Sequence, residues 1–445
     1  MSRKLFGTDG IRGRAGISPI DAETALRLGA AAGIFFKKRG NQLVRILIGR
    51  DTRISGSMLE SAIAAGFASE GICVVLAGVI PTPGISFGVR KMGFDAGVVI
   101  SASHNPYYDN GIKFFNNLGK KLSDEEELEI ENYYFSGNFS FDGNAGIVSS
   151  MAEPALFYKE FLVDSSKKLD ITIALDCANG AAFEIAPEVF KKLGANLVAT
   201  GTMPDGININ EKCGALYPEI VAENTKNSGA SIGIALDGDS DRLILSDELG
   251  NVIDGDQIIG IAALYLKERG RLPNNSVVTT VMSNAGLEIF LKNHGITMLR
   301  ASVGDRYVSE MMEKSGSVLG GENSGHIIFE INPTGDGILS AIQILNIMKE
   351  TGKSLSELAS PIKLFPQIQK KVKVKSKPDI DSIHELVEFI KEKEAKLSGG
   401  RILVRYSGTE PILRVMAEGA DSVEVQKIVD EIAEKADFLI NNSPE

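Results

Sequence analysis

The sequence predicts an α/β protein made of three successive α/β units and a smaller α+β unit at the C-terminus. Two observations carry this prediction. Apolar runs rich in β-branched residues alternate with helical segments three times along the chain, as in doubly wound folds. The length of 445 residues also exceeds what one hydrophobic core supports, because domains average about 150 residues. We place the units at residues 1–152, 153–255, 256–365 and 366–445.

The first unit is expected to begin with a helix over 19–38, with Ser18 as its N-cap, Pro19 as its first residue and Gly40 as its end. Residues 136–146 are rich in Gly, Ser and Asn and are expected to form loops. The other expected elements are a strand over 44–49, a helix from 57, a strand over 72–78, a turn over 80–84, a strand over 96–101 and a helix over 123–135.

The next two units repeat the alternation, and a lysine-rich connector at 361–379 leads into the fourth. The second unit is expected to contain strands over 170–176, 196–201 and 231–239 and helices over 181–194 and 218–229. The third is expected to contain strands over 276–283, 296–301 and 317–322 and helices over 254–270, 285–295, 305–316 and 336–352. Ligands of such folds gather at the loops where strands end.

Composition narrows the class of protein. A net charge of −11 argues against a nucleic-acid or membrane-surface binder, because both partners attract basic patches. Cys73, Cys177 and Cys213 form no CxxC pair, so neither a disulfide framework nor a zinc site is predicted. The N-terminus lacks the apolar stretch of a signal peptide, and no apolar run reaches the length of a membrane span. We therefore expect a cytoplasmic protein.

A hydroxyl, an imidazole and an ammonium are grouped after the strand at 96–101. Ser103 and His104 lie in the polar segment SASHNP, and Lys113 lies on the strand that follows. Ser is a common turn residue, so an isolated Ser-His pair would favour an ordinary turn. The motifs described next reverse that balance, and we interpret Ser103 as a nucleophile.

Three carboxylates stand directly after an apolar strand, at Asp237, Asp239 and Asp241. They can hold Mg²⁺ and leave room in an octahedral shell for waters and a phosphate oxygen. An EF-hand calcium loop is the rival, with Glu248 at its twelfth position, but Arg242 stands where that loop needs Gly. A solvated acidic turn is disfavoured because crowded carboxylates repel one another without a cation. The motif favours magnesium.

Two further loops offer groups for a polar ligand. In GENSGH, the side chains of Glu322, Ser324 and His326 can hold sugar hydroxyls, although a structural turn fits equally well. In RYSGTEPILR, arginines flank a Ser-Gly-Thr segment whose amides and hydroxyls can form an anion nest, which favours a phosphate site. The residues of that second loop are Arg405, Ser407, Gly408, Thr409 and Arg414. Three more arginines repeat the theme more weakly, with a solvated surface pair equally plausible: Arg12, Arg50 and Arg53.

Two motif matches are interpreted as structural. Ser231 fits a GxSxG pattern, but it opens a strand instead of occupying the strand-to-helix elbow of a hydrolase. The segment 351–354 resembles the end of a P-loop, but Ile347 stands where the first Gly belongs. We predict instead that Ser354 and Glu357 form a capping box at a helix start.

The motifs SASHNP, DGDSD, GENSGH and RYSGTEP occur in this order, one in each predicted unit. On these motifs the chain resembles the α-D-phosphohexomutase superfamily over its whole length. The segments LFGTDGIRG, ASHNPYYDNGIKFF, VGDRYV and TEPILRVMAEG are most similar to its bacterial amino-sugar branch, from which Tyr406 and CGALYPE depart. The resemblance implies three related mixed-sheet domains and a smaller C-terminal domain around a central cleft.

The resemblance also implies an isomerase that carries a phosphate on Ser103. It implies one Mg²⁺ per chain, bound by Ser103 and the three aspartates, with glucosamine 1,6-bisphosphate as intermediate and activator. Lys113 or His326 would transfer protons. The implied catalytic residues are Ser103, His104, Lys113, Arg242, His326 and Arg12. The implied substrate-binding residues are Glu322, Ser324, Arg405, Ser407, Gly408, Thr409 and Arg414.

Other hypotheses remain. Glucose or mannose phosphate as the substrate is the alternative within the same chemistry. A catalytically silent sugar-phosphate binder is disfavoured, because Ser103 and all three aspartates are present. A phosphatase is the third hypothesis, since a phosphoserine in an open site transfers its phosphate to water. The expected partner is a small sugar phosphate, with no nucleic acid or membrane, and a homodimer is kept as a hypothesis.

Overall fold

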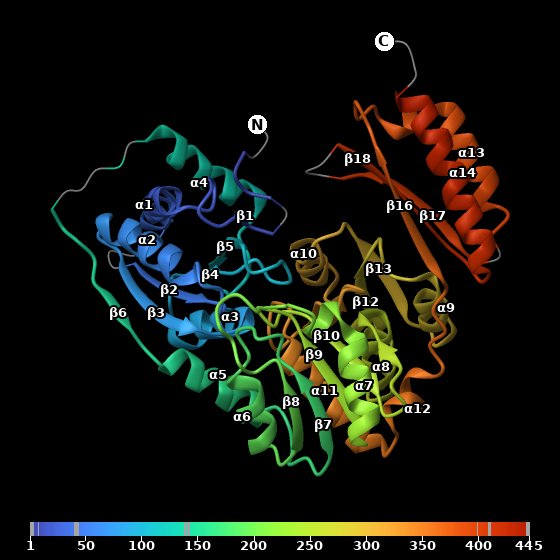
Figure 1. The fold of residues 1–445 in the computed structure, drawn as a ribbon, viewed down its shortest axis with the longest axis horizontal. Helices are drawn as coiled ribbons and strands as arrows, with labels where there is room; N and C mark the ends of the chain where they lie inside the picture. Colours follow the sequence, from blue (N-terminus) through green and yellow to red (C-terminus); the bar gives the residue numbers. More distant parts are fainter. Residues whose placement is uncertain are drawn as a thin grey trace. The chain divides into compact units, whose positions relative to one another are not determined.

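Four β-sheets with helices packed against them organise the part of the chain that the structure describes (Figure 1). The computed structural model describes residues 4–7, 9–39, 44–137, 139, 143–397, 399–407 and 411–441. One compact unit comprises Met1–Met282 with Ile296–Ser360, and a second comprises Ser283–Gly295 with Pro361–Glu445. Three sheets lie in the larger unit and one in the smaller. The predicted α/β class with a smaller C-terminal α+β part is confirmed.

The first sheet is mixed, with strand order β1-β5-β4-β2-β3-β6. Strand β5 runs antiparallel to both of its neighbours, and the other pairs are parallel. The strands are β1 (Ile11–Arg14), β2 (Arg45–Arg50), β3 (Cys73–Val79), β4 (Ala96–Ile100), β5 (Asp109–Asn116) and β6 (Val148–Ser150). The helices are α1 (Ala22–Arg39), α2 (Gly56–Ser69), α3 (Thr82–Met92) and α4 (Asp124–Ser136). Ser103 follows the carboxyl end of β4.

Helices cover both faces of this sheet. Neighbouring residues of a strand point to opposite faces, so each face has its own side chains to bury. Ile46 and Ile48 of β2 belong to the core that α1 and α2 complete. Leu47 faces α3, where a β-carbon at Gly88 would lie 2.9 Å from Leu47 Cδ2. Gly88 thus lets α3 approach the sheet closely. Because both faces of β2 are covered by helices, an uninterrupted apolar run forms this strand.

The segment 80–84 was predicted as a turn, and that prediction is wrong. Helix α3 begins at Thr82, with Pro83 in its first turn. A proline is tolerated there because the first N–H groups of a helix have no intrahelical acceptor. The helix α5 (Glu153–Asp164), which also has a proline in its first turn, was not predicted at all.

The start of the first helix was also predicted wrongly. Helix α1 begins at Ala22, whereas Ser18 and Pro19 lie in a turn closed by the bridge between Ile17 and Ile20. The Oδ1 atom of Asp21 accepts a hydrogen bond from the backbone N of Thr24 at 2.7 Å. An aspartate therefore caps this helix, because its short carboxylate satisfies an N–H that has no intrahelical partner.

The second and third sheets are also mixed, with orders β11-β10-β9-β7-β8 and β13-β12-β14-β15. The second contains β7 (Thr172–Asp176), β8 (Asn196–Thr200), β9 (Ile232–Leu236), β10 (Leu243–Asp247) and β11 (Val252–Ile253), with η1 (Gly214–Leu216), α6 (Ile185–Lys192) and α7 (Pro218–Ser228). The third contains β12 (Ser276–Thr280), β13 (Thr297–Ala301), β14 (Leu319–Gly321) and β15 (Ile327–Phe329). The helices along that part of the sequence are α8 (Gly255–Glu268), η2 (Pro273–Asn275), α9 (Ala285–Asn293), α10 (Asp305–Ser315), α11 (Gly337–Thr351) and α12 (Leu355–Ala359).

Both structural interpretations of motif matches are confirmed here. Ser231 directly precedes β9 and has no strand-to-helix elbow around it. Ser354 and Glu357 form a reciprocal capping box at the start of α12.

The smaller unit has an antiparallel sheet of order β16-β18-β17. Its strands are β16 (Gln367–Lys373), β17 (Arg401–Tyr406) and β18 (Ile412–Glu418). Its helices are α9, η3 (Ile380–Ser382), α13 (His384–Glu394) and α14 (Ser422–Asn441). The apolar side chains of β18 and α14 form a separate core, so this unit has its own hydrophobic interior.

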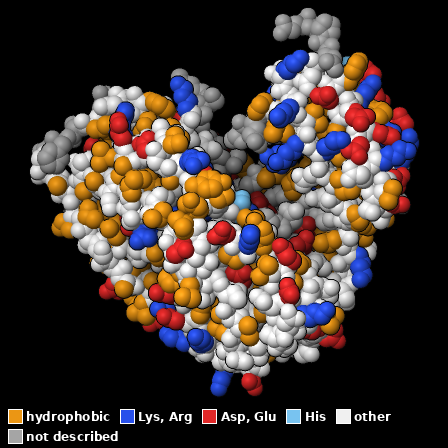
Figure 2. All heavy atoms as spheres, viewed as in Figure 1, with side chains coloured by type: hydrophobic (Ala, Val, Ile, Leu, Met, Phe, Trp, Pro, Cys, Tyr) orange, Lys and Arg blue, Asp and Glu red, His pale blue; other side chains and the backbone are white. Residues whose placement is uncertain are grey.

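Charges of both signs are interspersed on the visible face of the larger unit (Figure 2). Among the described residues, no helix combines the length and apolar character that a membrane crossing requires.

A buried carboxylate joins two helices of the larger unit. Asp336, 1% exposed, accepts hydrogen bonds from Tyr158 Oη on α5 at 2.9 Å and from the backbone N of Leu339 on α11 at 2.9 Å. A third hydrogen bond comes from Asn332 Nδ2 at 3.0 Å. Burial raises the pKa of Asp336 from 3.8 to about 6, although these three donors oppose the rise.

We predict that Asp336→Asn gains stability relative to the wild type as the pH rises from 4 to 7. Between the unfolded pKa near 3.8 and the folded pKa of about 6, the folded wild type binds more protons than the unfolded chain, so its stability falls as the pH rises. The variant lacks this titration and should gain about 1–3 kcal/mol over the window. Urea unfolding in metal-free buffer, followed by circular dichroism, measures the difference, and a pH-independent difference would contradict the prediction.

Candidate active site

Ser103 is held in a buried loop immediately after β4, with an unusual backbone. Its residue exposure is 1% and its φ is +51°, a left-handed conformation that costs a non-glycine residue about 1 kcal/mol or more. The hydroxyl donates a hydrogen bond to Asp237 Oδ2 at 2.6 Å and lies 3.4 Å from His104 Nδ1. The structure thus brings the predicted nucleophile against the predicted metal loop, 134 residues further along the chain.

The three aspartates of that loop follow β9 and are all buried. Their candidate ligand oxygens lie within 4.8 Å of one another. Neither Asp239 Oδ1 nor Asp241 Oδ1 accepts a hydrogen bond from any residue that the structure describes. Burial, with repulsion from Asp241 and Asp239, raises the pKa of Asp237 to about 8. Buried acceptor atoms without donors, in a cluster of repelling carboxylates, are the chemistry that a divalent cation completes.

Lys113 on β5 is the cation nearest to these aspartates. Its Nζ lies 3.0 Å from Asp239 Oδ2 and 3.5 Å from Asp241 Oδ2. It also lies 3.2 Å from Asp9 Oδ2. Burial by itself would lower the pKa of Lys113, but the three carboxylates raise it far above the ordinary value, so the side chain is an ammonium.

Asp9 is a site residue that the sequence analysis missed. It pairs with Lys113, Lys121 and Arg12, which together hold its pKa well below the ordinary value despite its burial. Arg12 also donates from Nη1 to the backbone O of Ala102 at 3.3 Å, next to the serine loop. The signal was available, because Asp9 and Arg12 share the segment FGTDGIRG, from which only the arginine was selected.

The start of α3 supports the metal loop. Thr82 donates from Oγ1 to Asp239 Oδ2 at 2.6 Å and from its backbone N to Asp239 O at 2.9 Å. A β-carbon at Gly238 would lie 2.5 Å from Ser103 O, so only glycine permits the two loops to approach this closely. Thr82 was not among the predicted site residues, because its segment was predicted as a turn.

His326 connects the third sheet to the same cluster. Its Nδ1 lies 3.7 Å from Asp241 Oδ1, and its Nε2 lies 3.3 Å from Asp305 Oδ2. The backbone N of Gly335 donates to Nε2 at 2.9 Å, which leaves Nδ1 to carry the proton of the neutral ring. Burial would lower the pKa of His326, but Asp305 and Asp241 raise it. Asp305 was missed, because VGDRYV served only as a signature of the resemblance.

Glu322 and Ser324, the other two candidates of the GENSGH loop, are hydrogen-bonded to each other. Glu322 accepts from the backbone N of Gly304 through Oε1 at 3.1 Å and from Ser324 Oγ through Oε2 at 3.1 Å.

Arg242 lies close to Asp241, with 4.0 Å between Nε and Oδ1. His104 is half-buried, and burial together with Arg242 and Arg12 lowers its pKa to about 4, so it is neutral at pH 7.

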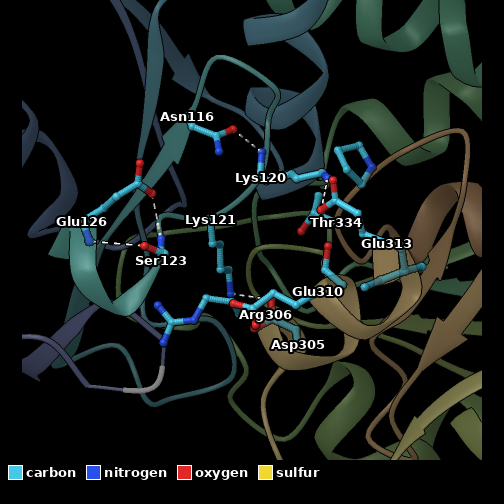
Figure 3. A pocket seen from close by; sticks show the side chains of 13 residues that line it. Asn116, Lys120, Lys121, Ser123, Glu126, Asp305, Arg306, Glu310, Glu313 and Thr334 are labelled. Atoms are coloured by element: carbon cyan, nitrogen blue, oxygen red, sulfur yellow. Dashed lines mark hydrogen bonds and ion pairs between the residues drawn. The ribbon is translucent and has the colours of Figure 1, made fainter. Parts of the chain in front are cut away.

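A pocket of about 160 Å³ lies beside this network, between the segment that leads into α4 and helix α10 (Figure 3). Lys121 and Asp305 point toward one another in it, 2.5 Å apart. Lys120 and Glu313 form a second ion pair of 2.8 Å. Arg306 donates to Leu122 O at 2.8 Å and lies 3.1 Å from Glu127 Oε2. These ion pairs connect residues 120–127 with residues 305–313. Since each of these cations has an acidic partner, the pocket offers little positive charge for a phosphate.

Arg50 and Arg53, two of the weaker candidates for a phosphate site, are instead paired with carboxylates of the protein. Arg53 has a side-chain exposure of 0%, and its Nε lies 2.9 Å from Asp51 Oδ2. Its other nitrogens donate to backbone carbonyls of the serine loop. Arg50 pairs with Glu60, with 3.1 Å from Nε to Oε2. Burial between carbonyls and a carboxylate makes Arg53 a structural cation.

The predicted phosphate motif lies in the smaller unit. Arg405 of β17 stands directly opposite Arg414 of β18, so both side chains leave the same face of the sheet. Burial, with repulsion from Arg414, lowers the pKa of Arg405. Ser407 is 4% exposed and its backbone O accepts from Lys377 Nζ at 2.7 Å. Two facing guanidinium groups favour an anion between them. Gly408 and Thr409 lie outside the described residues.

Family profiles match four successive segments of the chain. They are the phosphoglucomutase/phosphomannomutase alpha/beta/alpha domains I (residues 3–141), II (155–250) and III (254–365) and the C-terminal domain (370–435). Among solved structures, a phosphoglucomutase/phosphomannomutase family protein from Burkholderia thailandensis superposes with a TM-score of 0.82 at 25% identity, covering 97% of each chain. N-acetylphosphoglucosamine mutase from Aspergillus fumigatus, solved with GlcNAc-6P and magnesium, superposes with a TM-score of 0.68 at 18% identity, covering 99% of this chain and 96% of that one.

Curated relatives match over nearly the full length. The phosphoglucosamine mutase of Syntrophotalea carbinolica is 50% identical over 444 residues, 98% of this chain and 97% of the relative. That of Citrifermentans bemidjiense is 48% identical over 441 residues, 97% of each. The chain therefore belongs to the phosphoglucomutase/phosphomannomutase family, as the order of its four motifs indicated.

Proposed function

We propose that the protein is a phosphoglucosamine mutase, an isomerase that interconverts glucosamine 6-phosphate and glucosamine 1-phosphate. The observation that carries the reaction class is the 2.6 Å hydrogen bond from the Ser103 hydroxyl to Asp237, within a buried group of three aspartates. The amino-sugar preference rests on curated phosphoglucosamine mutases that are 47–50% identical over nearly the whole chain. Phosphomannomutase or phosphoglucomutase activity is the alternative, supported by the descriptions of the family profiles and of the Burkholderia thailandensis structure.

In the proposed reaction, a phosphate on Ser103 is transferred to the free hydroxyl of the sugar phosphate. This yields glucosamine 1,6-bisphosphate, whose other phosphate then returns to Ser103, and the net result is isomerisation. Asp237, Asp239 and Asp241, with the Ser103 oxygen, would hold one Mg²⁺ per chain. The unbonded carboxylate oxygens and the raised pKa of Asp237 support this set of ligands. When bound, the ion neutralises negative charge that develops on the transferred phosphoryl group.

The other charged groups have distinct proposed roles. Lys113, Arg242 and Arg12 add positive potential where the phosphoryl group is transferred. Of the two candidates for proton transfer, His326 is favoured over Lys113. The raised pKa of Lys113 keeps it an ammonium, whereas an imidazole exchanges protons near neutral pH. His104 is neutral and contributes a hydrogen-bonding ring beside Ser103.

Substrate recognition is assigned to two other loops. Glu322 and Ser324 would hold sugar hydroxyls in either orientation of the ring. The C-terminal part would hold the phosphate that is not reacting, through Arg405, Ser407, Gly408, Thr409 and Arg414. We divide the chain for these roles into residues 1–152, 153–255, 256–365 and 366–445. We further propose that the protein acts in the cytoplasm on a small sugar phosphate, and a homodimer remains a hypothesis.

The substrate assignment predicts that kcat/KM is higher for glucosamine 1-phosphate than for glucose 1-phosphate or mannose 1-phosphate. The reason is that a site built for the 2-amino group leaves polar groups unpaired when another substituent replaces it. Turnover of the three sugar phosphates with the same enzyme preparation measures this. Equal or better use of mannose phosphate would instead support the alternative.

The nucleophile assignment predicts that Ser103→Ala lowers kcat by at least about 10³-fold, because it removes the hydroxyl that carries the phosphoryl group. The melting temperature should stay near that of the wild type, since the hydroxyl contributes little packing. Ser86→Ala is the matched control, because Ser86 is buried and its hydroxyl donates to the backbone O of Gly119, away from the three aspartates. Intact-mass spectrometry should show the phosphate in the wild type and the control and none in Ser103→Ala. Full turnover by Ser103→Ala would refute the mechanism.

The metal assignment predicts that Mg²⁺ binds more tightly as the pH rises from 6 to 8.5. The pKa of Asp237, raised to about 8, means that binding must displace a proton at neutral pH. Asp239→Asn should weaken binding at least about tenfold, because it removes one charged ligand. Asp247→Asn, which changes a buried aspartate outside the triad, should leave the affinity near that of the wild type. Titration calorimetry with MgCl₂ measures each constant, and a pH-independent affinity would contradict this ligand set.

A further inference from the structure

A buried arginine, Arg53, donates hydrogen bonds to the backbone carbonyls of the serine loop. Arg53 Nη2 donates to Ser103 O at 2.9 Å and to Asn105 O at 2.8 Å. Its Nη1 donates to Pro106 O. Its Nε donates to Asp51 Oδ2 at 2.9 Å, which orients the guanidinium plane. One side chain therefore bonds three carbonyls within four residues, and its fork geometry allows it to do so.

An asparagine from the second domain reaches the same two carbonyls. Asn210 Nδ2 donates to Ser103 O at 2.9 Å and to Asn105 O at 3.1 Å. Asn210 is 6% exposed and has a φ of +58°, a conformation that asparagine tolerates better than most residues. It lies 107 residues from Ser103 in the sequence. Two donors from different domains thus converge on one pair of acceptors.

The same residue that these donors hold also contacts the metal loop through its hydroxyl. Ser103 O is directed into Arg53 and Asn210, the residue has a φ of +51°, and its hydroxyl donates to Asp237 Oδ2, 2.6 Å away. The backbone N of Ser103 is also held, because it donates to Ser101 Oγ at 2.9 Å. Both ends of the residue are therefore restrained, and an accurately placed reacting oxygen is what group transfer requires.

We propose that Arg53 and Asn210 are positioning residues for phosphoryl transfer and form a clamp that holds the Ser103 oxygen against the metal loop. Neither touches the reacting atoms, so they are not catalytic residues. Because Asn210 belongs to the same part of the chain as the metal loop, the clamp links the orientation of the nucleophile to the domain that holds the aspartates. This inference rests on the proposed phosphoserine function.

Asn210→Asp tests the clamp most directly, since it keeps the size and backbone preference of the residue and replaces only the donor with an acceptor. We expect kcat for glucosamine 1-phosphate to fall about 10- to 100-fold, with KM changed less than about threefold. Hydrogen–deuterium exchange of the peptide covering residues 101–107 should become at least about tenfold faster, because the two carbonyls lose a donor.

Asn208→Asp is the matched control. Asn208 lies in the same segment and its Nδ2 donates to Met203 O at 3.0 Å, not to the serine loop. It should therefore keep both the kcat and the exchange rate of the wild type. Asn210→Gly is a second variant in case the aspartate prevents folding, because glycine accepts the positive φ and adds no charge. We expect it to lower kcat with little change in KM, as Asn210→Asp does.

Three results would overturn the proposal: an unchanged kcat in the Asn210 variants, a loss confined to KM, or an equal loss in Asn208→Asp. The phosphoserine function fails separately, if intact-mass spectrometry finds no phosphate on Ser103 of active wild-type enzyme. The exchange measurement does not depend on turnover. It therefore shows whether Asn210 restrains the loop even if the proposed reaction proves wrong.

Discussion

The burial of three carboxylates within 4.8 Å of one another is the constraint on which the rest of this structure depends. Carboxylates removed from water repel strongly, and such a group survives only with compensating positive charge. Lys113 approaches Asp239 and Asp241 from the first sheet, and Arg242 follows the loop itself. The remaining unbonded oxygens are the places where a cation would complete the balance. The same electrostatic demand therefore organises stability and chemistry.

Elements far apart in sequence must meet around this loop, and the backbone is shaped accordingly. Ser103, Ser240 and Asn210 all have positive φ values, which cost free energy and persist only where the surroundings impose them. Hydrogen bonds to the serine loop from Arg53 and Asn210 supply that restraint. Thr82 supplies it for the metal loop. The energy stored in these turns is offset by buried hydrogen bonds, which place the reacting groups with little freedom to move.

The elements that the sequence predicts correctly are those in which local pattern and local chemistry agree. The apolar strands before Ser103 and Asp237 were predicted because β-branched runs and polar loop ends are local signals. The prediction failed where prolines were taken as turn formers, as at the start of α3, or as a helix start, as at Pro19. It also missed Asp9 and Asp305, although both lie in segments that carry the resemblance, because only the fold shows which cation each aspartate meets.

The sequence by itself determined the α/β class and the order of the four motifs, and it singled out Ser103, Lys113 and Arg242 as candidates for the site around the metal loop. These follow from periodicity and residue chemistry, which act over a few neighbouring positions. Tertiary structure alone decided that Arg53 is a buried loop clamp and that Asn210 bonds the serine loop across 107 residues. It also decided that Asp9 and Asp305 belong to the ion-pair network. Hydrogen bonds and charges act over a few ångströms in space, and only the folded chain brings such distant residues within that range.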